Sequence, residues 1–290
     1  PHDDHAEIGI LGGTGLYDMP GLEGARDVEI ETPYGAPSAP LRLGRVAGRD
    51  VAFLARHGRQ HHLLPSEIPY RANIWALKAL GVGKVISPSA VGSLQEGLPP
   101  RRLVVPDQIV DRTRHRQDTF FGDGIVVHVS LADPYAEGLR RILVHAAREV
   151  DVRIKDGGTY LCMEGPQFST RAESQWYRQM GCDVIGMTSV TEARLCREAE
   201  IAFASISMVT DFDAWREEQE GVTAGEILAV LRENADDATK VVRAAIPHVP
   251  TTPLPENQSL TTAIVTPLDA VPAATLERLA PILARVRGSA

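Results

Sequence analysis

The sequence predicts an α/β fold with a single domain, a three-layer sandwich built around a mixed central β-sheet. Short runs rich in β-branched residues alternate along the chain with segments of helical periodicity, which favours a sheet covered by helices. Two early runs form a predicted hairpin, so the sheet should contain antiparallel as well as parallel strands. A chain of 290 residues, 43% of them hydrophobic, has the size and composition of one globular α/β domain.

The predicted elements follow one another in the order that such a sandwich needs. The first strand, Glu7–Leu11, ends in a glycine-rich loop, and the hairpin pairs Leu41–Val46 with Val51–Ala55. Apolar residues spaced by three and four predict helices at Tyr70–Leu80 and Asp133–Val150. Further strands are predicted at Lys84–Ser87, Leu103–Val110, Gly158–Met163, Asp183–Ile185 and Ile201–Val209, and further helices at Thr170–Met180, Val190–Glu198 and Thr223–Ile246.

A proline-rich stretch separates the main domain from the C-terminus. Four prolines lie within Pro247–Pro255, where the globular pattern ends. We therefore assign residues 1–250 to the main domain and residues 251–290 to a C-terminal tail. One helix is predicted in the tail, at Ala273–Val286, and the tail could pack on the core or on a neighbouring subunit.

Charge and composition exclude several classes of partner. The formal net charge is -8 and no block of five like charges occurs, so nucleic acid is not expected as a main partner. No apolar run approaches the ~20 residues that span a bilayer, and the acidic N-terminal residues do not resemble a signal peptide. The three cysteines form no CxxC pair and are expected to be reduced thiols in a cytoplasmic protein.

Two segments that follow predicted strands are suited to binding an anion. In Gly12-Gly13-Thr14-Gly15 the glycines let backbone N–H groups approach a ligand, and Thr14 adds a hydroxyl. The loop has neither GxGxxG spacing nor the Lys-Ser/Thr pair of a Walker A loop, and it could simply be a tight strand-to-helix turn. In ARHGRQHH, Arg56 can bond two oxygens of an oxyanion at once and His57 can donate another bond.

The histidine-rich loop leaves two other interpretations open. It could be a solvated basic loop, or His57, His61 and His62 could bind a metal ion. No Cys, Asp or Glu lies within the run to complete a metal shell. A third segment, SPSAVGSL, offers Ser89 and Ala90 as small residues that do not crowd a phosphate, although it also fits an ordinary turn.

Two later segments carry aromatic and acidic side chains. In EGPQFSTRAES, Thr170 and Glu173 predict a capping box, and Phe168 just before it could stack on a planar ring or pack in the core. In TDFDAW, Asp211 and Asp213 stand at i and i+2 after an apolar strand and should point the same way. Close like charges would raise one pKa and keep a proton available, unless the segment is only a polar turn.

These five segments together resemble the 5'-methylthioadenosine phosphorylases, a group within the trimeric purine nucleoside phosphorylase family. The resemblance covers about residues 7–248 and rests on GGTGL, ARHGRQH, AVGSL, EGPQFSTRAES and TDFDAW in this order. It implies a nucleoside phosphorylase-like fold for residues 1–250. Two positions depart from the pattern: Gly186 stands where many members carry Asn, and Ser89 replaces a frequent Thr.

The resemblance implies a phosphate site and a nucleoside site. The phosphate-binding residues would be Thr14, Arg56, His57, Ser89, Ala90 and Thr188, with Gln60 and His61 near the rim. The nucleoside-binding residues would be Phe168, Ser169, Met187, Asp211, Asp213, Ala224, Ile227, Leu228 and His128. Ala224, Ile227 and Leu228 would form an apolar methylthio pocket, although the last two also fit the core stripe of their helix. His128 would reach the site of a neighbouring subunit, which implies a homotrimer.

The implied reaction is phosphorolysis of 5'-methylthioadenosine to adenine and 5-methylthioribose 1-phosphate, with inorganic phosphate as co-substrate and no metal or other cofactor. Asp211 would protonate N7 of the leaving purine or bond the protonated base, with Asp213 as its partner. An Asp at 211, where phosphorylases of 6-oxopurines carry Asn, favours a 6-amino purine. The alternatives are a phosphorylase of methylthioinosine, inosine or guanosine, a hydrolase that uses water, and a non-catalytic or NAD-dependent nucleotide-binding protein.

Overall fold

The computed structural model describes residues 4–13, 19–216 and 224–288, without the side chains of 224–229 and 231. The strands are β1 (Ile8–Gly12), β2 (Glu23–Val28), β3 (Leu41–Val46), β4 (Arg49–Ala55), β5 (Lys84–Ser93), β6 (Leu103–Val105), β7 (Gln108–Arg112), β8 (Ile154–Asp156), β9 (Thr159–Met163), β10 (Val184–Gly186) and β11 (Ala202–Asp211). The helices are α1 (Tyr70–Ala79), α2 (Glu137–Glu149), α3 (Arg171–Gln179), α4 (Ser189–Glu198), α5 (Ala224–Ala245), α6 (Ala273–Arg278) and α7 (Ala280–Gly288), with short 3₁₀ turns at η1 (Ile246–His248), η2 (Pro255–Gln258) and η3 (Leu268–Ala270).

The strands form one mixed sheet. Its main path is β2-β3-β4-β1-β5-β10-β9-β7, and β11, β6 and β8 branch from β5. Parallel pairs join β1 to β4 and β5, and β11 to β5, whereas β2, β3 and β4 pair antiparallel. The mixed sheet predicted from the sequence is confirmed, including the hairpin between β3 and β4.

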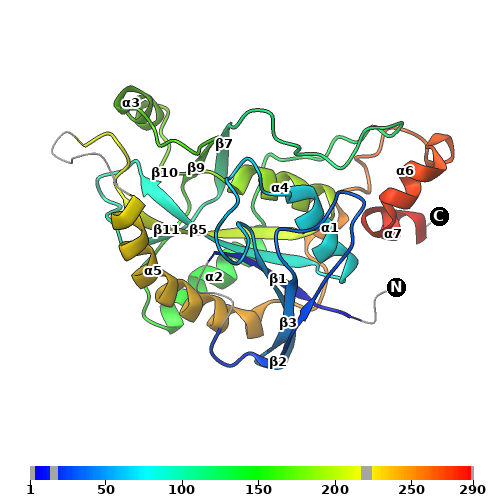
Figure 1. Cartoon of the computed structure of the whole chain (residues 1–290), viewed down its shortest axis with the longest axis horizontal. Helices are drawn as coiled ribbons and strands as arrows, with labels where there is room; N and C mark the ends of the chain where they lie inside the picture. Colours follow the sequence, from blue (N-terminus) through cyan, green and yellow to red (C-terminus); the bar gives the residue numbers. More distant parts are fainter. Residues whose placement is uncertain (1–3, 14–18, 217–223, 289–290) are drawn as a thin grey trace.

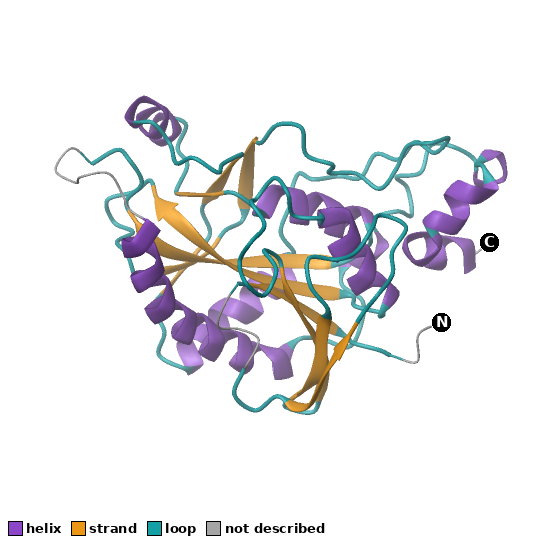
Figure 2. Ribbon diagram, viewed as in Figure 1, coloured by secondary structure: helices purple, strands orange, loops and turns teal. Residues whose placement is uncertain are grey.

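Helices cover both faces of this sheet (Figures 1 and 2). Successive residues of a strand point to opposite faces, and β1 shows the consequence. Ile10 packs in one apolar cluster with Leu143 of α2 and Val241 of α5. Leu11, the next residue, packs in a second cluster with Leu77 of α1. The helices α1 and α4 lie on one face and α2 and α5 on the other, so the predicted three-layer sandwich is confirmed.

Strand β5 splits the sheet and thereby shapes its functional edge. Its residues from Lys84 to Val91 pair in parallel with β11, while Gly92 and Ser93 pair antiparallel with β10. The register between β11 and β5 shifts between Val209 and Asp211, which is a β-bulge. A bulge re-aims the side chains that follow it, and this one lies where the carboxyl ends of β5 and β11 meet.

Several predicted boundaries are wrong. The single strand predicted at Leu103–Val110 is two strands, β6 and β7, which flank Pro106 and pair with different neighbours. Proline has no N–H for a ladder bond, so the chain leaves the sheet there and re-enters it elsewhere. The helix predicted from Asp133 begins only at Glu137, after Pro134. Two strands were not predicted: β2, whose residues are mostly exposed, and the three-residue β8.

The C-terminal tail packs on the core of its own chain. Leu260, Leu279 and Ile282 are buried in the same apolar cluster as Leu77 of α1. In place of the single helix predicted over Ala273–Val286, the tail has α6 and α7, which meet beside Pro281. Proline removes the helical hydrogen bond to the residue four positions earlier and clashes with its carbonyl. Within the described residues, no helix combines the length and the apolar character that a membrane crossing requires.

Candidate active site

The candidate active site is a cavity of about 360 Å³ at the carboxyl ends of β1, β4, β5 and β11. Gly13 follows β1, Arg56 and His57 follow β4, and Ser89 to Gly92 form the end of β5. The loops that follow β4, β9 and β10 complete the wall. Ligands of open α/β sheets bind in this position, because strand ends carry loops and leave a crevice between them.

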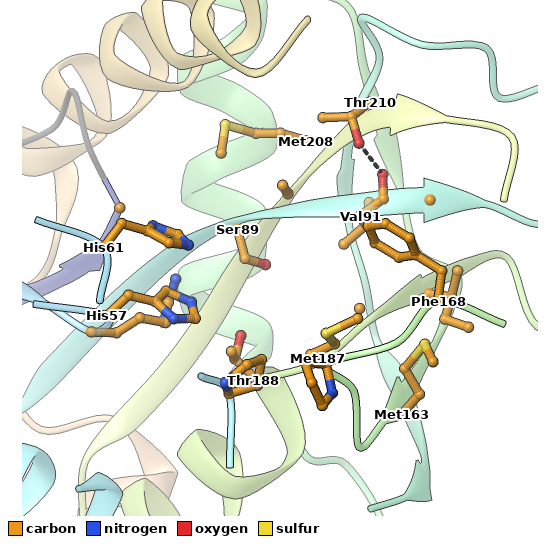
Figure 3. A pocket seen from close by; sticks show the side chains of 18 of the residues that line it. His57, His61, Ser89, Val91, Met163, Phe168, Met187, Thr188, Met208 and Thr210 are labelled. Carbon is orange, nitrogen blue, oxygen red and sulfur yellow. Dashed lines mark hydrogen bonds between the residues drawn. The ribbon is translucent and has the colours of Figure 1, made fainter. Parts of the chain in front are cut away.

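The cavity has two chemically different ends. Figure 3 shows the imidazoles of His57 and His61 at one end and Phe168 and Met163 at the other. Ser89 lies between them. One end is therefore basic and hydroxyl-rich, and the other is aromatic and apolar, as expected of a site that binds an anion beside a planar ring.

The guanidinium of Arg56 is held in place by hydrogen bonds to other residues of the chain. Its Nε donates to Glu192 at 2.6 Å, Nη1 donates to the Pro88 carbonyl at 2.9 Å, and Nη2 lies within hydrogen-bond distance of Glu192, Ser87 and Leu11. Burial alone would lower the pKa of Arg56, but the Glu192 carboxylate outweighs burial and raises it. The pair is buried and neutral overall, and these contacts leave one N–H of Nη1 for a ligand.

His57 is neutral at physiological pH. Burial, with a smaller contribution from the Arg56 charge, lowers the pKa of His57 to about 4. Its Nδ1 lies 2.9 Å from the Leu63 carbonyl, so Nδ1 carries the proton and donates it there. Nε2 is then an acceptor, which differs from the sequence-based expectation that His57 donates to an oxyanion. The ring stacks on His61 with centroids 4.4 Å apart.

Two hydroxyls and a helix end complete the basic end. Ser89 is buried, and its Oγ has no hydrogen-bond partner among the described residues. Thr188 is the N-cap residue of α4, yet its side chain makes no capping bond. Both side chains line the cavity. A helix N-terminus attracts anions through its unpaired N–H groups and dipole, so this end suits a phosphate.

Asp211 is partly buried at the edge of the cavity and bonded through both oxygens. Oδ1 accepts the backbone N–H of Asp213 at 2.7 Å, and Oδ2 lies 2.7 Å from the Thr210 hydroxyl. Burial raises the pKa of Asp211, and the charge of Asp213 is only its smallest contribution. The raised pKa agrees with the expectation from sequence, but its main cause is burial rather than repulsion between carboxylates.

The bonds of Thr210 show how the Asp211 carboxyl is held. The Thr210 hydroxyl lies within hydrogen-bond distance of both the Val91 carbonyl, at 3.2 Å, and Asp211 (Figure 3 shows the first bond). A hydroxyl has one proton to donate. It points mainly to Asp211, whose Oδ2 accepts it at 2.7 Å, and the Val91 carbonyl is the longer, second acceptor. This bond favours the ionised carboxylate and lowers the pKa of Asp211, but burial outweighs it.

Asp213 does not extend the strand. Its φ of 52° turns the chain, so the expectation that Asp211 and Asp213 point the same way along an extended strand is wrong. Asp213 accepts a hydrogen bond from Ser174 of α3, and burial raises its pKa. It lines the cavity as a neighbour of Asp211. Ser169, also buried, does not line the cavity, and its hydroxyl contacts the Met163 sulfur at 3.8 Å.

The apolar end is formed by Phe168, Met163 and Met187. Phe168 lies just before the capping box of α3, in which Thr170 and Glu173 bond each other as predicted. Its side chain is 50% exposed, so it is not a core residue. A half-exposed ring at the mouth of a cavity is placed to stack on a planar ligand.

The glycine at position 186 is explained by the side chain of Tyr160, which lies against it. A Cβ at this position would lie 1.9 Å from the hydroxyl and 2.7 Å from Cζ of Tyr160, which is fully buried. The tyrosine therefore occupies the space in which a side chain at 186 would lie. The departure from Asn noted in the sequence has a packing reason, which could not be recognised without knowing that β9 lies beside β10.

The structure brings together nine predicted residues at the cavity wall: Arg56, His57, Ser89, Ala90, Phe168, Met187, Thr188, Asp211 and Asp213. His128 does not line the cavity of its own chain. Its backbone N–H donates to the Ala263 carbonyl in the tail. Gln60 is also absent from the wall, whereas His61 is part of it. The predicted roles of Thr14 and of the side chains of Ala224, Ile227 and Leu228 fall outside the described residues.

Two residues that position others in the site were not predicted from the sequence. Glu192 pairs with Arg56, and its only signal was an acidic residue on a buried face of a predicted helix. Thr210 bonds Asp211, but nothing in the sequence reveals the bulge that brings it there. The possible metal ligands His57, His61 and His62 do not converge as a three-atom set in the described structure.

Comparisons with known proteins show the family of this chain. A sequence model of the phosphorylase superfamily matches residues 7–247. The S-methyl-5'-thioadenosine phosphorylase of Koribacter versatilis is 52% identical over 284 residues, which cover 98% of this chain and 97% of that protein. The enzyme of the same name from Thermosynechococcus vestitus is 50% identical over 285 residues, which cover 97% and 99%.

Solved structures of related proteins are similar to this chain over most of its length. A methylthioadenosine phosphorylase sourced from an antarctic soil metagenomic library superposes with a TM-score of 0.93 at 50% identity, covering 97% of this chain and 99% of that chain. Methylthioadenosine phosphorylase from Schistosoma mansoni, in complex with adenine, superposes with a TM-score of 0.81 at 36% identity, covering 84% and 92%. The chain therefore belongs to the phosphorylase superfamily and, within it, to the S-methyl-5'-thioadenosine phosphorylases.

Proposed function

We propose that this chain catalyses the phosphorolysis of 5'-methylthioadenosine to adenine and 5-methylthioribose 1-phosphate. The observation that carries the proposal is one cavity with an end suited to an anion and a partly buried carboxyl of raised pKa, Asp211, at the other end. The relatives are named for this activity, and a similar structure from Schistosoma mansoni holds adenine. The enzyme is a pentosyltransferase, because it transfers a sugar from a base to phosphate.

The anion end binds inorganic phosphate as the second substrate. Ser89, Thr188 and the free Nη1 N–H of Arg56 donate to it, and the N-terminus of α4 adds its dipole. Nε2 of neutral His57 accepts a bond from a protonated phosphate oxygen. Because Glu192 neutralises Arg56, the phosphate keeps most of its negative charge. That charge stabilises the positive ribose ring of an oxocarbenium-like transition state before an oxygen attacks C1'.

The acid end assists departure of the base. Adenine leaves poorly as an anion, and a proton on N7 removes that cost. A protonated Asp211 can donate this proton, and the resulting carboxylate accepts bonds from N7–H and from the 6-amino group on the same edge. Thr210 and the N–H of Asp213 hold the carboxyl in place throughout. Phe168 and Met187 provide apolar surface for the ring.

We propose further that catalysis needs no metal or other cofactor. Three copies of the chain assemble into a homotrimer in the cytoplasm. In this trimer, His128 of each chain completes the active site of a neighbouring chain. His128 is outside the cavity of its own chain. It lies beside Val126 and Val265, which are 48% and 63% exposed. Phe168 and Leu64 at the cavity mouth are also half-exposed, so the two surfaces are complementary in apolar character.

The decisive experiment measures adenine release from 5'-methylthioadenosine with phosphate present and with phosphate omitted, before and after dialysis against EDTA. We expect release only with phosphate, and the same rate after EDTA. Adenine release without phosphate would identify a hydrolase instead. A higher kcat/KM for methylthioinosine or inosine than for 5'-methylthioadenosine would identify a 6-oxopurine phosphorylase. Loss of activity after EDTA that zinc restores would contradict the cofactor-free mechanism.

A further inference from the structure

A second cluster of chemically active side chains lies away from the cavity. His145 and Glu149 are one helical turn apart on α2, and His248 lies in η1 at the end of α5. One donor atom from each residue lies within 4.8 Å of the others. Glu149 is the centre: its Oε1 lies 3.3 Å from Nε2 of His145, and its Oε2 lies 3.2 Å from Nε2 of His248.

These donor types and spacings suit a transition metal ion. Imidazole nitrogen and carboxylate oxygen bind Zn²⁺ at about 2.0–2.2 Å, which puts donors of a tetrahedral site roughly 3.3 Å apart. The separations of the two imidazole nitrogens from Glu149, each to a different carboxylate oxygen, are close to this value at 3.3 and 3.2 Å. Residues at i and i+4 face the same side of a helix, so His145 and Glu149 can bind one ion together. Two histidines and one carboxylate leave a fourth position for water.

The backbone segments that carry the three side chains pack against each other. Ala146 and Ala147 of α2 are fully buried and share an apolar cluster with Ile246 and Val249, the residues on either side of Pro247 and His248. Nη1 of Arg49 donates to the Val249 carbonyl at 2.6 Å and fixes the end of the turn. Little order would have to be gained on binding, because only exposed side chains must adjust.

We propose that His145, Glu149 and His248 form a binding site for a divalent transition metal ion of the zinc class. The ion would join α2 to the end of α5, two elements that lie on the same face of the sheet (Figure 1). A ligand that binds only the folded state raises its stability. The site is separate from the cavity residues, so metal binding stabilises the fold and leaves the reaction itself unchanged.

The contacts also fit a simpler arrangement, in which protonated histidines form ion pairs with Glu149. The two arrangements respond differently to metal. An ion pair between exposed groups contributes about 0–1 kcal/mol and does not distinguish zinc from magnesium. A site with two imidazoles binds Zn²⁺ or Co²⁺ and ignores Mg²⁺, which prefers oxygen ligands in octahedral geometry.

The test uses the full chain without a histidine tag, stripped with EDTA and kept in phosphate-free buffer. Zn²⁺ binding is measured by calorimetry, and the melting temperature is measured with Zn²⁺ or Mg²⁺. We expect one Zn²⁺ per chain, a higher melting temperature with Zn²⁺ and no shift with Mg²⁺. Loss of a ligand in His145→Ala or His248→Ala should weaken binding at least about tenfold, since changes outside the first ligand shell alone cost 10–100-fold.

The matched control is His115→Asn, which removes an exposed imidazole on a distant loop and should bind Zn²⁺ like the unaltered chain. Glu149→Gln keeps a hydrogen-bonding side chain but removes the anionic ligand, so it should lose binding without losing its fold. The proposal is overturned if Zn²⁺ does not bind, or if both histidine variants bind it as tightly as the control. The latter result would place the ion elsewhere, for instance at His57, His61 and His62.

Discussion

At the residue scale, the chemistry of the site depends on the protonation of the Asp211 carboxyl. Asp211 is partly buried, its pKa is raised, and its two oxygens accept bonds from the Thr210 hydroxyl and the backbone N–H of Asp213. The bonding partners hold the carboxyl in one orientation, and burial raises its affinity for a proton of the kind that a departing purine needs. Neither property belongs to aspartate as such; both come from the bulge and the turn around it.

The substitution Asp211→Asn tests this directly. An amide can keep both contacts, since its oxygen accepts from Asp213 and its NH₂ donates to Thr210, so the fold should be retained. The amide cannot donate a proton to N7, and we expect kcat/KM for 5'-methylthioadenosine to fall by about 10²–10⁴. The loss should be smaller for 6-oxopurine nucleosides, whose O6 accepts a bond from the amide. Equal losses for both substrate classes would contradict a role at the purine edge.

The Ser89 hydroxyl is expected to contribute to phosphate binding but not to the stability of the fold. Its buried Oγ has no partner among the described residues, and leaving a buried polar group unpaired costs about 1–3 kcal/mol. The substitution Ser89→Ala should therefore leave stability equal or higher. Because the hydroxyl is proposed to bond phosphate, KM for phosphate should rise on the order of tenfold, with KM for the nucleoside unchanged.

Ser207 is the matched control for this experiment. It lies opposite Ser89 in the parallel pair of β11 and β5, and its Oγ is also buried without a partner in the described structure. It does not line the cavity. Ser207→Ala should change stability in the same direction and leave both KM values unaltered. A phosphate KM that rises equally in the two variants would mean that the effect is one of packing.

At the scale of elements, the sequence predicts what depends on local pattern. The capping box of α3 and the hairpin of β3 and β4 were correct, because turn and cap residues adjoin the elements they determine. Strand β5 was predicted to end at Ser87 but continues to Ser93, since a run of Pro, Ser and Gly is a turn by its own propensity. Pairing with β11 and β10 on either side overrides that propensity.

In the candidate site, too, local sequence pattern predicted some residues, and long-range pairing determined the others. Residues proposed to contact a ligand, such as Arg56 and Asp211, stand in recognisable segments at or just after the ends of strands. Residues that position them come from distant elements: Glu192 lies on α4 and Tyr160 on β9. Which elements become neighbours is decided by the split of the sheet at β5, and that split is a property of long-range pairing.

One contact between elements should control stability as a function of pH. Glu198, at the end of α4, accepts bonds from the Phe120 N–H and the Thr119 hydroxyl. Burial raises its pKa from 4.5 to about 7. The folded chain thus binds this proton more tightly than the unfolded chain. Its contribution is complete below pH 4.5, and up to about 3 kcal/mol is lost as the pH rises to about 7.

The substitution Glu198→Gln removes this titration and can keep both hydrogen bonds. We expect the variant to gain stability relative to the unaltered chain between pH 5 and pH 8, by about 1–3 kcal/mol. Urea unfolding at the two pH values measures the difference, and titrations shared by both proteins cancel in it. A stability difference that does not change with pH would show that Glu198 is ionised in the folded chain at both values.

At the scale of the whole molecule, the tail has a structural task that its sequence did not reveal. It pairs with the segment that carries His128: Val127 bridges Ile264, and the Val265 N–H donates to Val126. The tail therefore fixes the position of His128 on the surface, next to exposed apolar side chains. In the proposed trimer this surface covers the cavity mouth of a neighbour, so that one site takes residues from two chains.

Mixed trimers distinguish shared sites from independent ones. Chains with Asp211→Asn lack the acid, and chains with His128→Ala lack the residue proposed to reach across, so each variant alone should have low activity. In co-expressed mixtures, a site with Asp211 from a His128→Ala chain and His128 from an Asp211→Asn neighbour is intact. Random assembly makes about a quarter of all sites intact, so activity should return to roughly that fraction. Activity equal to the average of the two separate variants would instead mean that every site is complete within one chain.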